Sequence, residues 1–512
     1  MSARHLIVCA SMVALVAGCP RQGDGEGQGR SSGGQSTGPV GSADASAIDA
    51  TNAAVADAGA ASEPFPTEPP TAAAGVEFRL PAVRRTRLTN GVSLALVEHR
   101  ALPVLHVRVI LRGAGALFDP RDRPGLASIT ASLLREGATG MDSRAIAAAL
   151  DGAGASLDTD VGDDAITLSL QTLPERAEAT LSLVGKLLSE PTFPVDELDR
   201  LRRRELDRLA QEMAEPAWLS FRPFYRAVYG EAHPYSRFDT TPAALRAMQR
   251  SDVVGFHRDH VKGGAITVVA VGAITSDAFS QLAQRAFGAI APGEVARPTM
   301  PAVPAPESRR VFIVDRAGSA QAYVRVGRIG VRRNDPSWAA LTVANQVLGA
   351  SPSSRLFVDL RERRSLTYGV YSRVSAAVDQ GVVSASGSTR LERCEDFVTA
   401  LLEHLDRMGS EPVAADELTR ARTVVQNRLP TSIATAGDLA ARVAELELFS
   451  LGDDYFDRYR ERVAEVSSAA VREVGQRYYG SATSVIVVVG PARQLRAKLA
   501  RFGAVTVLRP AQ

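Results

Sequence analysis

Cysteine is scarce in this 512-residue chain, and its placement argues against a disulfide-stabilised fold. Of the 3 cysteines, Cys9 and Cys19 lie close to the N-terminus, so only Cys394 falls in the body of the chain. A single cysteine cannot form an intramolecular disulfide. The charged neighbours of Cys394 offer no histidine or asparagine with which a cysteine hydrolase would activate its thiol.

An excess of charge of one sign is also missing. The chain has 59 Lys and Arg residues against 57 Asp and Glu, so its formal net charge is only +2. This balance gives no bulk electrostatic reason to expect nucleic acid as a partner. Aromatic residues make up 5% and hydrophobic residues 45%, which is typical of a globular α/β or α+β protein rich in Ala, Val and Leu.

Near the N-terminus, the apolar run at residues 6–16 is too short for a helix that crosses a hydrocarbon core of about 30 Å. It follows Arg4 and ends in Val-Ala-Gly-Cys, which resembles the bacterial lipobox. We therefore expect residues 1–19 to be a lipoprotein signal peptide and Cys19 to carry a diacylglycerol. The alternative is an ordinary export signal with an incidental cysteine. Pro20 and Arg21 follow without an aspartate, which by resemblance to other lipoproteins implies the outer membrane, on its periplasmic or cell-surface side.

Residues 20–75 contain mainly Gly, Ser, Ala, Asp and Pro, with almost no large apolar side chain. Such a segment buries too little surface to offset its chain entropy, so we expect a disordered tether. A proline-rich run at residues 64–70 should stiffen its end towards polyproline II. An anchor followed by a tether would leave the folded body free to meet a partner.

The remainder of the chain repeats itself. Asp119-Pro120 stands before an apolar segment, as Asp335-Pro336 does, and the closing apolar strands at 264–272 and 482–490 also match. These similarities lie about 220 residues apart in one consistent order, which is the signature of an internal repeat. They predict an N-terminal half at residues 76–290, a Pro- and Ala-rich linker at 291–306 and a C-terminal half at 307–512.

Each copy mixes strands and helices. Alternating strand patterns, as at 92–97 and 104–110, are followed by a helix, a further strand such as 165–170, long helices and the closing strand. This order predicts an α+β fold in which each half is a mainly antiparallel sheet with helices on one face.

Residues 124–137 predict a short apolar helix, because Pro124 and Gly125 interrupt the preceding segment and Gly137 supplies a stop. The segment resembles the active-site helix of the pitrilysin/insulinase-type zinc peptidases, whose pattern is Gly-Leu-Ala-His-x-x-Glu-His-x-Leu-x-x-Gly. In that family the two histidines bind Zn²⁺ and the glutamate activates water. The resemblance covers roughly residues 80–505, and it implies two homologous halves enclosing a peptide-sized chamber.

All three metal-site side chains are absent here. Position by position, the histidines fall on Ser128 and Ser132 and the glutamate on Ala131. A hydroxyl is a poor zinc ligand, and alanine has no group that moves a proton. The resemblance also places the family's third ligand at Glu212 and a supporting glutamate at Glu205, although their arginine-rich helix is more typical of a solvated, salt-bridged face. We expect this chain to bind no metal, like the non-zinc subunit of two-chain bacterial peptidases and mitochondrial-processing-peptidase-like proteins.

A second dense match begins at residue 345 and resembles the family's Asn-x-x-Leu-Gly, Ser-Arg-Leu, Leu-Arg-Glu and Leu-x-Tyr block. In active members an arginine, and a tyrosine seven residues after it, hydrogen-bond the carbonyl of the scissile peptide and its developing oxyanion. Arg361 and Tyr368 have this spacing. The resemblance therefore implies that both stabilise a transition state in trans.

The alternative is that this block serves packing alone. Arg361 would then pair with Glu362 or Asp359, and the apolar positions would form core: Leu356, Leu360, Leu366 and Val370. Elsewhere, His257 and His260 near a helix end lack a third metal ligand, and His233 has no assignable catalytic duty.

Two functions from different classes remain open. In the first, the chain is the zinc-less subunit of a heterodimeric metallopeptidase, whose sister chain holds the zinc and whose substrate is a peptide or unfolded polypeptide. In the second, it is a catalytically inert, chamber-shaped scaffold or peptide-binding protein. The retained Arg361 and Tyr368 favour the first.

Overall fold

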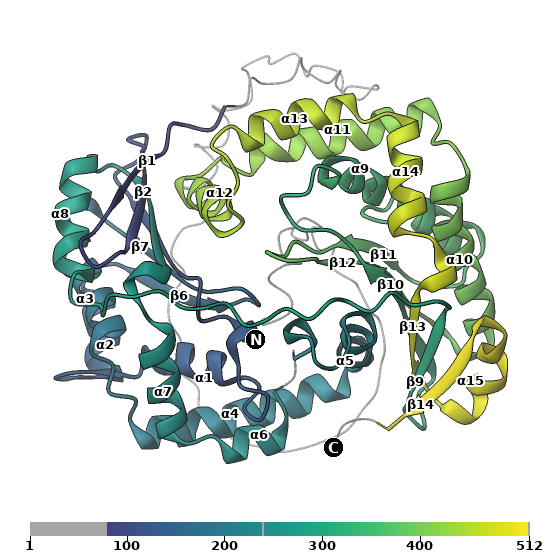
Figure 1. The fold of residues 1–512 in the computed structure, drawn as a ribbon, viewed down its shortest axis with the longest axis horizontal. Coiled ribbons are helices and arrows are strands. Elements are labelled where there is room, and N and C mark those ends of the chain that lie inside the picture. The colour runs from purple at the N-terminus through teal and green to yellow at the C-terminus, as the bar shows by residue number, and fades with distance from the viewer. Residues whose placement is uncertain (1–78, 238–239, 510–512) are drawn as a thin grey trace, which may run out of the picture. The chain divides into compact units, whose positions relative to one another are not determined.

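The computed structural model describes residues 79–237 and 240–509, which form two halves, each built on a six-stranded sheet (Figure 1). Both halves belong to one compact unit that starts at Glu77. The predicted signal peptide, Cys19 and the tether lie outside the described residues. Within the described part of the chain, no helix combines the length and apolarity needed to cross a bilayer.

The strands of the N-terminal half are β1 (Arg84–Arg87), β2 (Ser93–Glu98), β3 (Leu105–Leu111), β4 (Gly137–Ala138), β5 (Met141–Asp142), β6 (Ser156–Val161), β7 (Ile166–Thr172) and β8 (Ile266–Gly272). Its helices are α1 (Leu126–Leu133), α2 (Ser143–Gly152), α3 (Ala177–Ser189), α4 (Val195–Ala214), α5 (Pro216–Tyr229), α6 (Pro242–Ala247), α7 (Arg250–His260) and α8 (Ser276–Phe287). The stretch from α8 to the next strand is fully described, has neither helix nor strand, and contains the predicted linker.

The strands of the C-terminal half are β9 (Arg310–Asp315), β10 (Gln321–Ile329), β11 (Val370–Val374), β12 (Val382–Arg390), β13 (Val485–Gly490) and β14 (Ala504–Leu508). Its α-helices are α9 (Trp338–Leu348), α10 (Cys394–Ser410), α11 (Ala415–Thr431), α12 (Ala436–Leu448), α13 (Tyr455–Glu465), α14 (Ser468–Tyr478) and α15 (Ala492–Leu499). A π-helix, Phe357–Arg363, precedes β11.

The two sheets share one topology, which confirms the predicted α+β repeat. Their strand orders are β6-β7-β3-β8-β2-β1 and β11-β12-β10-β13-β9-β14. In each sheet the closing strand, β8 or β13, runs parallel to the opening strand, β2 or β9, and antiparallel to the central one. Only the last position differs, since β1 pairs antiparallel with β2 whereas β14 pairs parallel with β9.

Each half covers the second face of the other half's sheet with one helix. Helix α12 packs on β3 and β8, where Leu439 joins a buried cluster with Val269. Helix α5 packs on β10 and β13, where Phe224 joins a cluster with Val487. Figure 1 shows both helices reaching across in this way. This exchange explains why β8 and β13 are buried at every position, as their almost wholly apolar sequences require.

The expectation of helices on one face describes each half by itself, but in the chain the second face is covered as well. The remaining helices of each half share one large core cluster with the first face of its own sheet, some of them packing on other helices instead of on the strands. A pattern within one copy contains no information about which helix crosses to the other copy.

The edge hairpins of the two sheets are tied together at the Asp164 carboxylate, in the turn between β6 and β7. Asp164 Oδ1 accepts hydrogen bonds from Tyr235 Oη (2.7 Å) and Arg297 (2.8 Å), and Oδ2 accepts one from the backbone N–H of Val378 (3.1 Å), between β11 and β12. Burial raises the pKa of Asp164, and the hydrogen bonds from Tyr235 and Val378 act in the opposite direction. These hydrogen bonds to Asp164 fix where edge strand β11 lies relative to the N-terminal half.

Candidate functional site

Helix α1 begins where an Asp-Pro motif caps it. Asp119 accepts hydrogen bonds from the backbone N–H groups of Gly125 (2.6 Å) and Ala127 (2.7 Å), which have no partner within the helix. Gly125 adopts φ +94°, and a Cβ there would lie 2.2 Å from the hydroxyl of Thr240, so glycine is required. This start fixes the faces on which the three former metal-site positions lie.

Of those three positions, Ser128 and Ala131 are buried, and Ser132 hydrogen-bonds the backbone of its own helix. Ser128 is 8% exposed and Ala131 is 1% exposed. Ser132 is half-buried, and its hydroxyl donates to the backbone carbonyl of Ser128 at 2.8 Å. The positions therefore present two hydroxyls and a methyl group where the family's pattern has imidazoles and a carboxylate.

Glu205 and Glu212 lie on α4, which contacts α1, and they are bridged by an arginine between them. Arg208 donates to Glu205 Oε2 from Nε (2.8 Å) and Nη2 (2.5 Å), and to Glu212 Oε1 from Nη1 (2.5 Å). Burial lowers the pKa of Arg208, but the two carboxylates outweigh it and raise that pKa above its ordinary value. The guanidinium thus neutralises Glu212, which the family resemblance assigns as a metal ligand, and its supporting neighbour Glu205.

These residues do not fit a zinc ion. Structural and catalytic zinc sites need three or four protein ligands, usually including imidazole or thiolate. Helix α1 supplies neither, and both carboxylates already bind Arg208. In residues 79–237 and 240–509, no group of three or more His, Cys, Asp or Glu side chains is placed to hold a metal ion.

The three histidines His233, His257 and His260 each have a local hydrogen-bond partner. His257 contacts the backbone carbonyl of Leu188 (2.8 Å) and His260 that of Gly113 (2.7 Å), and burial lowers the pKa of both imidazoles. His233 accepts a hydrogen bond from the backbone N–H of Tyr235 at the start of a short 3₁₀ turn. All three contacts are of a kind that orders loops and helix ends.

Arg361 and Tyr368 are brought together by the π-helix and the loop after it. The guanidinium carbon of Arg361 lies 5.2 Å from the centre of the Tyr368 ring and 4.6 Å from that of Phe357, distances at which a cation is attracted to a ring face. Tyr368 is 89% exposed, which is unusual for so large an apolar ring. Among the residues that the structure describes, no carboxylate lies within ion-pair distance of Arg361.

The alternative pairing of Arg361 with Asp359 is wrong. Asp359 instead binds Nε2 of His404 (2.8 Å) and Nε of Arg364 (2.9 Å). The apolar part of that alternative is confirmed, since four side chains of the block are buried: Leu356, Leu360, Leu366 and Val370. The block therefore has a packing side and an exposed side, and Arg361 and Tyr368 are on the exposed side.

The loop between the two side chains is held in a constrained path. Ser365 adopts φ +50°, a left-handed conformation that costs a residue with a Cβ about 1–2 kcal/mol. Two residues later, the Thr367 hydroxyl donates to the backbone carbonyl of Ser388 on β12 at 2.6 Å. Strain retained next to exposed polar groups is characteristic of binding and catalytic sites.

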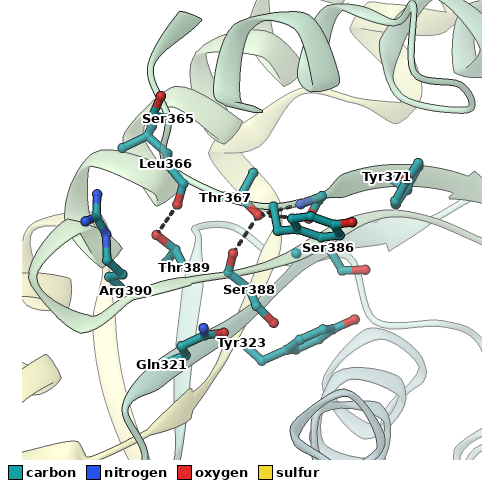
Figure 2. Close-up of a pocket in the computed structure, with 13 residues that line it drawn as sticks. Gln321, Tyr323, Ser365, Leu366, Thr367, Tyr371, Ser386, Ser388, Thr389 and Arg390 are labelled. Carbon is teal, nitrogen blue, oxygen red and sulfur yellow. Dashed lines mark hydrogen bonds between the residues drawn. The ribbon is translucent and has the colours of Figure 1, made fainter. Parts of the chain in front are cut away.

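Tyr368 forms part of the wall of a pocket of about 590 Å³ on the β11–β12 side of the sheet (Figure 2). Figure 2 shows Tyr371 and Arg390 at opposite ends, with Tyr323 and Ser388 between them. The volume lies within the range of about 300–1,000 Å³ that small-ligand sites usually have.

The sequence did not predict the pocket, although two residues of its wall, Leu366 and Tyr368, were singled out there. The alternation of serines along β12 was a visible signal of a polar face. What the sequence could not show is that β10, distant along the chain, pairs with β12 and sets Tyr323 opposite Ser388.

A two-fold α+β repeat with a separate exposed Arg–Tyr pair, and with no metal-binding cluster in the part of the chain that the structure describes, defines a peptidase-like fold. Residues 247–425 match the family profile described as the peptidase M16 inactive domain. Over 430 residues the chain is 25% identical to an uncharacterized zinc protease of Streptomyces coelicolor, covering 82% of this chain and 92% of that protein. The chain therefore carries a peptidase M16 inactive domain and is homologous to zinc proteases of this pitrilysin/insulinase-like family.

Solved structures agree. A peptidase M16 inactive domain from Pseudomonas fluorescens superposes with a TM-score of 0.75 at 25% identity, covering 80% of this chain and 98% of that one. A protease from Helicobacter pylori gives a TM-score of 0.74 at 18% identity, covering 80% of this chain and all of the other, and supports the fold alone.

Proposed function

We propose that this chain is the zinc-less subunit of a heterodimeric M16-type metallopeptidase. A sister chain with an intact His-x-x-Glu-His motif would hold the zinc, and this chain would supply Arg361 and Tyr368 to the peptide bound there. The observation that carries the proposal is the Arg361–Tyr368 contact itself, which is exposed and lies apart from the packed side of its block.

The chemistry of the pair suits peptide hydrolysis. Attack on a peptide bond builds negative charge on the former carbonyl oxygen, and donors aimed at that charge stabilise the transition state more than the ground state. A guanidinium supplies charged N–H donors and a phenol supplies one neutral O–H donor. Stacking of Arg361 on Tyr368 and Phe357 restricts where the guanidinium can go, which lowers the cost of placing it on substrate.

The sequence around Cys19 adds the proposed location. A lipidated Cys19 and a tether at residues 20–75 would hold the complex at the outer membrane, on its periplasmic or cell-surface side. The tether would let the folded body find its partner without changing its anchor.

A catalytically inert scaffold or peptide-binding protein of the same fold is the second candidate. It is favoured by the Arg208 bridge, in which both glutamates near the expected metal site are paired with an arginine of the same helix. An inert scaffold has no need of an exposed tyrosine stacked with an arginine that lacks a carboxylate partner among the described residues.

Reconstitution with a sister chain separates the two candidates. The partner is a chain with His-x-x-Glu-His but without the Arg–Tyr spacing, encoded in the same genome. We expect either chain alone to leave an unfolded polypeptide intact, and the mixed pair to cleave it. A sister chain that cleaves equally well with and without this chain would leave only the scaffold.

A further inference from the structure

We propose that the pocket bordered by Tyr368 is a subsite for a peptide carboxylate. The carboxylate is either that of an acidic side chain near the scissile bond or that of the peptide's C-terminus. This assignment rests on the proposed function. It names the class of substrate on which the Arg361–Tyr368 pair would act.

The composition of the wall carries the assignment. Of the 13 described residues that line the pocket, none is Asp or Glu, whereas Arg390, Gln321 and Ser388 all present hydrogen-bond donors. Arg390 is exposed, and no carboxylate in the described part of the chain lies within ion-pair distance of it. A ligand that brings a carboxylate would meet donors and one cation, but no competing anion.

Tyr323 adds a hydroxyl donor, which is oriented by a hydrogen bond from Arg325. Its Oη accepts a hydrogen bond from Arg325 Nη2 at 3.3 Å, so its own hydrogen is left to point elsewhere. Tyr323 lines the pocket, where that hydrogen can reach a ligand.

Arg325 is itself held rigidly beneath the pocket. It is 7% exposed, its guanidinium carbon lies 4.0 Å from the centre of the Phe221 ring, and its Nε donates to Ser220 Oγ at 2.8 Å. Its fixed positive charge lies one hydrogen bond from the pocket and favours an anionic ligand there.

The position of the pocket links it to the scissile bond. Tyr368 is both a wall of the pocket and one of the two proposed donors to the substrate carbonyl. A peptide whose carbonyl reaches Tyr368 therefore places an adjacent side chain, or its nearby C-terminus, at the pocket. A basic side chain at that place would meet Arg390 and only neutral acceptors, so we expect it to be excluded.

The test uses the reconstituted pair and matched peptides. One arm varies an internal residue next to the cleaved bond among Glu, Gln and Lys, and the other compares a free C-terminus with an amidated one. We expect a preference of about tenfold in kcat/KM for the carboxylate in one of the two arms, the size typical of a charge-assisted hydrogen bond. The arm that shows it identifies the source of the carboxylate.

Two variants place that preference in the pocket. Arg390→Gln should remove most of it, and Tyr323→Phe, which keeps the ring, should reduce it. Arg393→Gln is the matched control, because Arg393 is a neighbouring half-buried arginine that pairs with Asp396 and does not line the pocket. Hydrolysis without any carboxylate preference, or a preference unaffected by Arg390→Gln, overturns the subsite and leaves the proposed function intact.

A binding measurement on the full chain alone distinguishes a failure of the proposed peptidase function from a failure of the subsite. Titration with the same peptides should show carboxylate-dependent binding that Arg390→Gln weakens by about tenfold. If the mixed pair does not hydrolyse peptide but this binding is found, the subsite stands and the proposed function fails. If neither hydrolysis nor carboxylate-dependent binding is found, the subsite is overturned as well.

Discussion

His404, on α10, donates a hydrogen bond from Nε2 to the carboxylate of Asp359, on the π-helix that also carries Arg361, at 2.8 Å. His404 is 4% exposed, and its other ring nitrogen, Nδ1, has no partner among the described residues. Burial lowers the pKa of His404, which its bond to Asp359 offsets only in part. The imidazole is therefore neutral near pH 7, because a second proton on Nδ1 would be buried without an acceptor.

This contact predicts an acid-sensitive fold. Since the pKa of His404 is lower in the folded state than the ordinary value of 6.5, the unfolded chain binds the proton first as pH falls. The contribution of neutral His404 to the free energy of unfolding is therefore fully present above about pH 6.5. It declines as pH falls from there towards the folded-state pKa. Denaturant unfolding of the wild type and of His404→Gln at pH 7.5 and 5.5 tests this. The variant keeps an N–H donor but cannot titrate, so its stability should fall less, and identical declines would contradict the assignment.

Two helical glycines predict opposite responses to alanine. A Cβ on Gly185, in α3, would lie 1.8 Å from the backbone carbonyl oxygen of Ala286, in α8, whereas a Cβ on Gly255, in α7, would meet nothing within 4 Å. Gly185→Ala should therefore destabilise the fold by about 1–3 kcal/mol through overpacking. Gly255→Ala should stabilise it by about 0.5–1 kcal/mol, because alanine loses less backbone entropy in a helix. Equal effects of the two changes in thermal unfolding would show that α3 and α8 do not meet as described.

Zinc content tests the former metal site. Since Arg208 bridges Glu205 and Glu212, and α1 carries Ser128 and Ser132, we expect the purified chain to hold well under one zinc ion after mild chelation. Elemental analysis against an M16 peptidase with intact ligands provides the comparison. About one zinc per chain that survives chelation would contradict the site as described.

The proposed export and lipidation at Cys19, which lies outside the described residues, can be tested by substitution. We expect Cys19→Ser to abolish labelling by a palmitate analogue and to leave an uncleaved precursor or a soluble species. Cys9→Ser is the matched control, because that cysteine lies within the predicted signal peptide and outside the lipobox-like sequence. Unchanged processing and labelling of Cys19→Ser would show that the residue is incidental.

The repeat and the α+β class could be predicted because both copies contain the same order of apolar strands and Asp-Pro caps, and such local signals survive at low identity. The helix exchange between the halves could not, since Leu439 and Phe224 read as ordinary core positions of their own copies. The salt-bridged face expected for α4 is confirmed by the Arg208 bridge, whose spacing of three residues from Glu205 and four from Glu212 favours ion pairs on one helix face.

If Arg361 and Tyr368 both donate to the substrate carbonyl, turnover by the reconstituted pair depends on both side chains. Loss of one donor to a developing oxyanion typically costs about 2.7–4 kcal/mol, or ~100- to 1,000-fold in turnover. We expect Arg361→Ala to be the more damaging, Tyr368→Phe to follow, and Arg361→Lys to rescue only in part, because lysine cannot reproduce the planar guanidinium.

Assembly must be measured beside turnover, with Arg363→Ala as the control, since Arg363 is exposed on the same π-helix and outside the pair. We expect all variants to bind the partner and only those at Arg361 and Tyr368 to lose turnover. Complexes of Arg361→Ala and Tyr368→Phe that form normally and hydrolyse peptide within about twofold of wild type, far short of the loss expected for an oxyanion donor, would contradict it.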